Sequence, residues 1–374
     1  ARLGLTRLAT PWPALLRVRS AEDKGLLARE RKTGRATMGE DTVLPGCASR
    51  VAAADDLHDL CALDVTNQSS AEIRDGLMEQ LSTTGFLVLT NVPDYDEAEF
   101  LRACKALHAL PAEVKRTLYL AHDEPRNSNR YRGYHPFKAN DASHKEFLDV
   151  GLPIGQLDAD ERALPLYEET PWPTGAGRVW IRERFEQTFA SWYALALRVV
   201  RLLAEGLGKP ADFFDAWFAQ GSLSTFRSIH YLPRSAALVD SSQLSSEDAR
   251  LTTPPHADSG FLTFLATFGY PGLQVLVDGV YKSVAPVPPN TLVVNVGDTF
   301  SRLTGYRLKA TFHQVVDTGA ERFSAPLFLE PKYSARIPAG LLQGARARVD
   351  LDLPADAPWF GDWLVRRVKA SWIE

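Results

Sequence analysis

The stretch Pro255–Gly260 reads PHADSG and places His256 two residues before Asp258, and His313 follows fifty-five residues after Asp258 in the segment TFHQVV (Thr311–Val316). Residues two apart on an extended segment point to the same face, so His256 and Asp258 can bind one ion while a third ligand arrives from a distant strand. Two imidazoles and one carboxylate on one face of an octahedron suit non-haem Fe(II) and oxygen chemistry, whereas zinc prefers a closed tetrahedron. We therefore expect an iron site at His256, Asp258 and His313.

A second motif follows in the segment ERFSAPLF (Glu321–Phe328). On a strand Arg322 and Ser324 share one face, and a guanidinium beside a hydroxyl can bind both oxygens of a carboxylate. The alternative is a surface ion pair followed by an ordinary serine. The apolar run Phe323–Leu329 favours the carboxylate clamp, because an inward-facing guanidinium needs a negatively charged partner.

Composition excludes several classes of protein. The 374 residues are 45% hydrophobic and 24% charged, which is ordinary for a globular chain. The net charge of -4 and the lack of a long Lys/Arg run argue against nucleic-acid binding. The three cysteines form no Cys-x-x-Cys pair, so neither a disulfide framework nor a structural zinc site is indicated. No apolar run reaches the roughly 18 residues of a membrane span, so we expect a soluble protein without a membrane partner.

Residues 1–40 form a distinct N-terminal extension. They carry no acidic residue before Glu22 and several arginines among small and apolar residues, namely Arg2, Arg7, Arg17 and Arg19. This composition resembles a transit peptide. The equally weighted alternative is a translated upstream segment, since Met38 is the first methionine. We expect a cytoplasmic protein, or an organellar one if the extension is a transit peptide, and we leave these residues out of the fold prediction.

The remaining chain changes from mixed to β-rich. Ser69–Glu72 predicts a capping box at the start of a helix, Gly85–Leu89 a buried strand, and Arg178–Leu207 a long amphipathic helix. We also expect a helix over Glu97–Leu110 and another from Pro111, with Val114, Leu118 and Leu120 as its apolar positions. A polar insertion of about twenty residues runs to Thr253, and it is either a lid near the site or a surface loop.

After that insertion, short strands and turns alternate at roughly ten-residue spacing, which indicates a sandwich or barrel. Thr291–Val296 is an almost continuous apolar run, so we expect a strand buried on both faces. Histidines outside the two motifs are assigned structural roles: His58, His108, His122, His135 and His144.

The motifs in this order resemble the isopenicillin N synthase-like family of Fe(II)/2-oxoglutarate-dependent dioxygenases. The segments that carry the resemblance are Gly85–Leu89, Arg132–Tyr134, Lys145–Phe147, Pro171–Pro173, Pro255–Gly260, Gly272–Val275, Val293–Asp298, Lys309–Val316 and Glu321–Pro326. The resemblance implies a mainly β fold with added helices, whose core is a distorted double-stranded β-helix, or jelly roll. It also implies an N-terminal α/β region over residues 41–215, a jelly-roll core over 216–335 and a C-terminal helical tail over 336–374.

The resemblance assigns His256, Asp258 and His313 to the metal, and Arg322 and Ser324 to the far carboxylate of 2-oxoglutarate. The sequence departs from the family in one relevant place. The usual Asn-Tyr-Tyr-Pro is His-Tyr-Leu-Pro here (His230–Pro233), so Tyr231 is our candidate for the tyrosine that helps to hold the co-substrate. The basic residue that often follows the second ligand histidine is replaced by Gln314.

The implied cofactors are Fe(II), 2-oxoglutarate as co-substrate, and O2. The expected reaction couples decarboxylation of 2-oxoglutarate to succinate with hydroxylation, desaturation or cyclisation of a small molecule of secondary metabolism. We expect a monomer. Arg132, Tyr134 and Arg227 are candidate substrate residues, and the cations Arg130, Arg132, Lys145 and Arg227 suggest an anionic substrate.

Two alternatives stay open. One is an oxidase of the same fold that uses no 2-oxoglutarate, in the manner of isopenicillin N synthase or aminocyclopropane carboxylate oxidase, which also have the Arg-x-Ser pair. The other is a metal-free jelly-roll binding protein.

Overall fold

The computed structural model describes residues 57–139, 141–175, 177–234, 251–337 and 359–371. All of them belong to one compact unit that spans residues 46–374. The N-terminal extension and most of the polar insertion lie outside the described residues. In the part of the chain that is described, no helix combines the length and hydropathy needed to cross a membrane.

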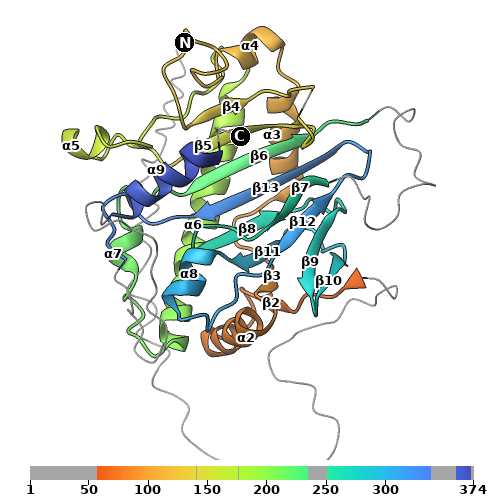
Figure 1. Ribbon diagram of the computed structural model, residues 1–374, viewed down its shortest axis with the longest axis vertical. Coiled ribbons are helices and arrows are strands. Elements are labelled where there is room, and N and C mark those ends of the chain that lie inside the picture. Colours follow the sequence, from red (N-terminus) through yellow and green to blue (C-terminus); the bar gives the residue numbers. More distant parts are fainter. Residues whose placement is uncertain (1–56, 140, 176, 235–250, 338–358, 372–374) are drawn as a thin grey trace, which may run out of the picture. The chain divides into compact units, whose positions relative to one another are not determined.

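Two sheets form the core of this unit (Figure 1). The larger sheet has eight strands, in the order β2 (Ala62–Asp64), β3 (Phe86–Thr90), β11 (Leu292–Val296), β8 (Leu262–Ala266), β13 (Arg322–Leu329), β6 (Thr225–Tyr231), β5 (Lys145–Gly151) and β4 (Gly133–His135). The smaller sheet has five, in the order β1 (Leu57–His58), β10 (Val280–Val284), β9 (Leu273–Val277), β12 (His313–Val316) and β7 (Leu251–His256).

The two sheets face each other across an apolar core. Phe86, Val88 and Val293 of the larger sheet pack in one cluster with Leu273 and Val275 of the smaller sheet. Strand β11 lies between β3 and β8, and every one of its residues is buried. The expectation of a strand buried on both faces is therefore confirmed.

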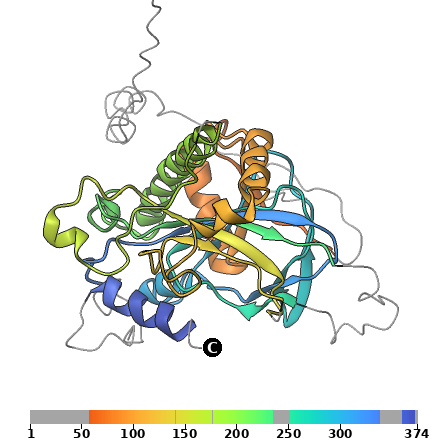
Figure 2. The same cartoon turned by 90° about the horizontal axis from the view of Figure 1, so that it is seen from above.

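Helices cover the outer face of the larger sheet, on the side shown at the top of Figure 2. They are α2 (Ser70–Thr83), α3 (Glu97–His108) and the long α6 (Val179–Gly206). The capping box at the start of α2 is present, because Ser69 accepts from the Glu72 amide while the Glu72 carboxylate accepts from the Ser69 amide. The shorter helices are α4 (Ala112–Arg116), α5 (Ala159–Arg162), α7 (Asp215–Phe218), α8 (Asp298–Leu303) and α9 (Phe360–Ser371).

Two local predictions need correction. The helix after Pro111 ends at Arg116, before the apolar Leu118, because the Leu118 carbonyl accepts a hydrogen bond from the Tyr134 amide instead of continuing the helix. The polar insertion also does not extend to Thr253, because β7 already begins at Leu251 and pairs with β12.

Candidate active site

The three expected metal ligands meet at the edge of the smaller sheet. His256 ends β7 and is the register partner of His313, which begins β12, and their ring centroids are 4.2 Å apart. Asp258 lies two residues beyond β7, with its Oδ1 3.5 Å from His256 Nε2 and 3.7 Å from His313 Nε2. Each residue can offer one ligand atom, and these atoms all lie within 4.8 Å of one another.

Both imidazoles are oriented with the same nitrogen toward this centre. His256 Nδ1 lies 2.9 Å from the Pro254 carbonyl, and His313 Nδ1 lies 3.2 Å from the Thr311 carbonyl. A carbonyl only accepts, so each Nδ1–H donates and each Nε2 keeps its lone pair. The two Nε2 atoms face Asp258, which is the orientation that a shared metal ion requires.

Asp258 is held as a carboxylate by residues that the sequence motifs did not identify. Thr263 Oγ1 and Asn295 Nδ2 donate to Asp258 Oδ2 at 2.5 and 2.8 Å. Burial raises the pKa of Asp258, but the neighbouring imidazoles of His256 and His313 and the hydrogen bonds from Asn295 and Thr263 outweigh burial and lower this pKa to well below its ordinary value. Because Oδ2 is occupied, Oδ1 remains for a metal, and the donor set fits a divalent ion such as Fe(II).

The expected carboxylate clamp opens into the same cavity as this cluster. Arg322 and Ser324 on β13 and Tyr231 on β6 line that cavity together with His256, Asp258 and His313. Arg322 is the register partner of Tyr231, and its guanidinium carbon lies 3.6 Å from the centre of the tyrosine ring. The Arg322 Nη2 atom is buried and has no hydrogen-bond partner among the described residues. A buried guanidinium nitrogen in this state is ready to bind an anionic ligand.

Lys145 adds a second positive charge at the clamp. It lies on β5 in register with Tyr231, and its ammonium group donates to Thr252 O and Thr253 Oγ1 at 3.3 and 3.2 Å. Burial raises the pKa of Tyr231, but the charges of Arg322 and Lys145 lower it to below its ordinary value. Within the described residues neither cation forms an ion pair, so this end of the cavity carries excess positive charge.

Comparison with known proteins places this geometry in a family. The model of the 2OG-Fe(II) oxygenase superfamily matches residues 228–331, which include the three candidate metal ligands and the candidate clamp residues Tyr231, Arg322 and Ser324. The 2-oxoglutarate-Fe(II) type oxidoreductase hxnY of Emericella nidulans is 30% identical over 278 residues, which are 70% of this chain and 74% of the relative. The chain belongs to the 2OG-Fe(II) oxygenase superfamily.

Solved structures agree with this assignment. A 2OG-Fe(II) oxygenase family protein from Caulobacter crescentus superposes with a TM-score of 0.65 at 26% identity, over 83% of this chain and 98% of that one. A full-length Neurospora crassa protein in complex with alpha-KG gives a TM-score of 0.67 at 22% identity, over 86% of this chain and 99% of that one. The predicted jelly-roll fold is thus confirmed. As a member of the superfamily the chain is an oxidoreductase that uses Fe(II), 2-oxoglutarate and O2.

The three candidate substrate residues have different positions in this oxygenase. Arg132 is buried and is not among the residues that line the cavity. Its guanidinium donates to Thr225 Oγ1 and to the carbonyls of Leu223 and Ser224. Tyr134 is fully buried and bonds His108 Nδ1 at 2.9 Å. Arg227 does line the cavity, but its Nε and Nη2 atoms contact Asp149 at 2.6 and 2.8 Å. The charge of Arg227 is therefore balanced by its cross-strand partner.

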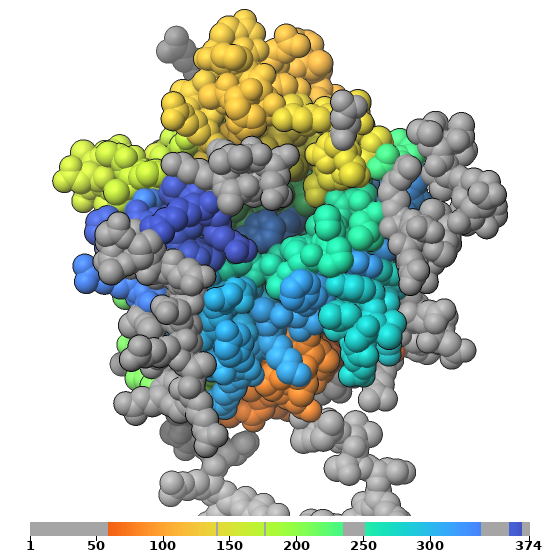
Figure 3. Space-filling view, viewed as in Figure 1, coloured from red at the N-terminus to blue at the C-terminus, as the bar shows by residue number. Residues whose placement is uncertain are grey.

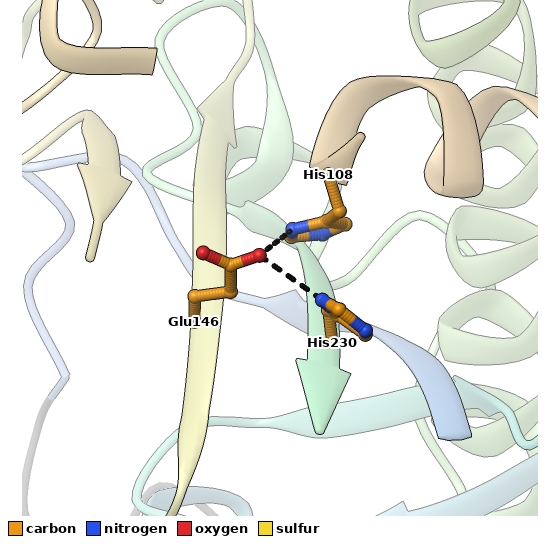
Figure 4. A group of neighbouring side chains, drawn as sticks. All are labelled: His108, Glu146 and His230. Carbon is orange, nitrogen blue, oxygen red and sulfur yellow. Dashed lines mark hydrogen bonds and ion pairs between the residues drawn. The ribbon is translucent and has the colours of Figure 1, made fainter. Parts of the chain in front are cut away.

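A second cluster of the same residue types, His108, Glu146 and His230, lies elsewhere in the oxygenase (Figure 4). His108 contacts Tyr134 Oη and Ser228 Oγ at 2.9 and 3.0 Å, and His230 contacts Glu146 Oε1 and Glu321 Oε1 at 3.0 and 2.9 Å. Lys115 also donates to both Glu146 oxygens, at 3.2 and 3.0 Å. All four imidazole nitrogens thus have protein partners, and this cluster is a hydrogen-bonded network. The sequence predicted a structural role for His108 but did not reveal the network.

Proposed function

We propose that His256, Asp258 and His313 bind Fe(II), and that Arg322, Ser324 and Tyr231 bind the far carboxylate of 2-oxoglutarate. The observation that carries this proposal is the unpartnered, buried Nη2 of Arg322 in the cavity that also holds the three ligand atoms. A guanidinium at this position matches a carboxylate at the distal end of a ligand whose other end reaches the metal.

The residues of the chain orient the reactants. The Nδ1–H bonds to Pro254 and Thr311 fix the two rings, and Thr263 and Asn295 fix Asp258. Iron bound there would supply oxygen activation coupled to the decarboxylation of 2-oxoglutarate. Apolar side chains such as Phe86, Leu265 and Phe328 line the cavity and limit the access of water to the reacting groups.

The charges at the clamp support 2-oxoglutarate as the co-substrate. Arg322 and Lys145 lie in one row across three neighbouring strands, on either side of Tyr231. A dicarboxylate such as 2-oxoglutarate places one carboxylate at the metal and the other beside these two cations. This arrangement favours use of 2-oxoglutarate over the alternative oxidase without it.

We further propose that the enzyme hydroxylates a small organic molecule, with desaturation or cyclisation as variants of the same reaction. The expected anionic character of this substrate gains no support from Arg132 or Arg227, because neutral acceptors and Asp149 already engage them. A single chain holds all the proposed ligand and clamp residues, so a monomer would be sufficient for the proposed reaction.

The test is anaerobic addition of Fe(II) and then 2-oxoglutarate to the full chain, followed by visible spectroscopy. We expect a metal-to-ligand charge-transfer band that depends on both additions and that requires a higher 2-oxoglutarate concentration in Arg322→Ala. Glu99→Gln, a change on the surface of α3, should behave as wild type. A protein that forms no such band, or that forms product in air without an equal amount of succinate, would contradict the proposal.

A further inference from the structure

The inner face of β13 continues past the metal cluster to a second polar group, Glu330. Arg322, Ser324, Pro326 and Phe328 line the main cavity at alternate positions, and Glu330 is the next residue in this series. Phe328 is the register partner of Thr263, the residue that bonds Asp258. Along the strand, Arg322 therefore lies on one side of the metal cluster and Glu330 lies on the other.

Glu330 lines a side cavity that shares lining residues with the main one. Its lining residues are Thr225, Arg227, Asp258, Ser259, Gly260, Phe328 and Glu330. Arg227, Asp258 and Phe328 line both cavities. The space-filling view shows the surface hollowed between the dark blue helix α9 and the teal strands (Figure 3). A molecule in the side cavity would be next to a proposed metal ligand and away from the clamp.

Within the part of the chain that is described, one oxygen of the Glu330 carboxyl group has no hydrogen-bond partner. This atom, Oε2, is buried. Burial, followed by the charge of Asp258, raises the pKa of Glu330 to about 8 despite the charges of Arg132 and Arg367. A Cβ at position 260 would collide with Glu330 Oε1, so Gly260 provides the room for this carboxyl group. Buried carboxyl groups without partners are unfavourable unless a ligand supplies one.

Arg227 supplies a complementary group on the same cavity. Its Nε and Nη2 atoms bind Asp149, and its third nitrogen, Nη1, takes part in neither bond. An anionic substrate group would meet the carboxylate of Asp258, and a cationic group would meet the guanidinium of Arg227 with that of Arg132 nearby. The side cavity therefore favours an uncharged polar group over either ion.

We propose that Glu330 is a specificity-determining residue that pairs with an N–H or O–H donor of an uncharged substrate. Arg227 faces an acceptor, such as a carbonyl oxygen, on the same molecule. The inference rests on the proposed function, because it assigns the side cavity to the substrate of that reaction. A site built around a buried hydrogen-bonding group rejects an analogue that lacks the matching donor far more strongly than an apolar site does.

The test uses a matched pair of uncharged probes, 2-piperidone and N-methyl-2-piperidone, which differ in one N–H donor. Each is titrated by ligand-observed NMR against the full chain loaded with 2-oxoglutarate and with Zn(II) in place of Fe(II). We expect 2-piperidone to bind about tenfold more tightly or better. Glu330→Leu should remove this preference, and Glu330→Gln, whose carbonyl still accepts, should keep most of it. Glu99→Gln serves as the surface control.

The outcomes separate this inference from the proposed function. Binding of 2-oxoglutarate is measured first in each sample, and its absence from wild type would count against the proposed function. If 2-oxoglutarate binds, the inference is overturned by equal binding of the two probes, by no binding of 2-piperidone, or by an unchanged preference in Glu330→Leu. The wild-type pair decides the question even if Glu330→Leu fails to fold.

Discussion

Two clusters in this oxygenase contain two histidines and one carboxylate within 4.8 Å, and they differ in what surrounds them. In His256, Asp258 and His313, each Nδ1 donates to a backbone carbonyl, and both Nε2 lone pairs face the carboxylate. In the cluster of His108, Glu146 and His230, all four ring nitrogens have protein partners, and Lys115 contacts the carboxylate.

The contrast shows that a metal site needs free lone pairs as well as the right residue types. Backbone carbonyls can only accept, so they fix the tautomer that a metal requires. Tyrosine, serine and carboxylate partners use both nitrogens of each ring in the second cluster, and the ammonium group of Lys115 supplies the positive charge there. We therefore propose iron binding for the first cluster and structural stabilisation for the second.

The largest difference in iron binding between the two clusters should appear when one histidine of each is replaced. His313→Ala should weaken Fe(II) binding more than about 100-fold and abolish turnover, because it removes one of the three proposed ligands. His108→Ala should bind iron as wild type does, while it lowers the free energy of unfolding by several kcal/mol. Anaerobic equilibrium dialysis with metal analysis measures both variants. Loss of iron in His108→Ala with an intact fold would reverse the assignment.

Substitutions in the clamp should weaken the binding of 2-oxoglutarate and leave the binding of iron unchanged. Arg322→Ala should raise the KM for 2-oxoglutarate by about 10- to 100-fold, as expected when a charge-assisted bidentate contact is lost. Arg322→Lys keeps the charge without the fork and should fall between wild type and Arg322→Ala. Succinate formation is measured against the 2-oxoglutarate concentration. An unchanged KM in Arg322→Ala would remove the clamp from the site.

A smaller effect is expected from the hydroxyl that fixes Asp258. Thr263→Val removes the donor to Asp258 Oδ2 without changing the shape of the side chain, and it should weaken Fe(II) binding by about tenfold. Thr263→Ser retains the hydroxyl and should stay close to wild type. The dissociation constants of the two variants are compared by anaerobic titration, and equal values would show that this bond does not support the ligand.

Among these variants, Glu146→Gln should have the smallest effect on iron binding, but it should clearly lower the stability of the fold. Burial raises the pKa of Glu146, but the neighbouring imidazole of His108 and the hydrogen bonds from His230 and Lys115 outweigh burial and lower this pKa to well below its ordinary value. Since the folded-state pKa is depressed, the carboxylate stabilises the fold above its unfolded pKa of about 4.3, and this contribution is lost as pH falls below that value.

At pH 7 the Gln variant should therefore be less stable by about 3 to 5 kcal/mol. Its melting temperature should also decline less than that of wild type between pH 6 and pH 3, and iron content should not change. Thermal unfolding over this pH range, with metal analysis at pH 7, measures both effects. Parallel pH profiles for the two proteins would contradict the role given to Glu146.

The sequence predicted the parts of the site that depend on local spacing. His256 and Asp258 are two residues apart, as are Arg322 and Ser324, and their common cavity follows from that spacing together with the family resemblance. Partners that meet across strands could not be predicted in this way. Asn295 reaches Asp258 over 37 residues of sequence, and its only sign was a polar residue within an apolar run.

The interaction partners of several buried charged and polar side chains could not be identified from the sequence either. Arg227 looked like a free cation until the register of β5 and β6 placed Asp149 opposite to it. His108 depends on Ser228, which is 120 residues away. Glu330 looks like an ordinary acidic residue before a proline, and only the fold shows that its carboxyl group is buried beside Gly260.

The most direct test of the difference between the two clusters is a crystal structure of the full chain grown anaerobically with Fe(II) and 2-oxoglutarate, with anomalous data collected at the iron edge. We expect a single strong peak among His256 Nε2, Asp258 Oδ1 and His313 Nε2, and none at the cluster of His108, Glu146 and His230. A peak at the second cluster, or no peak at the first, would contradict the assignment of iron.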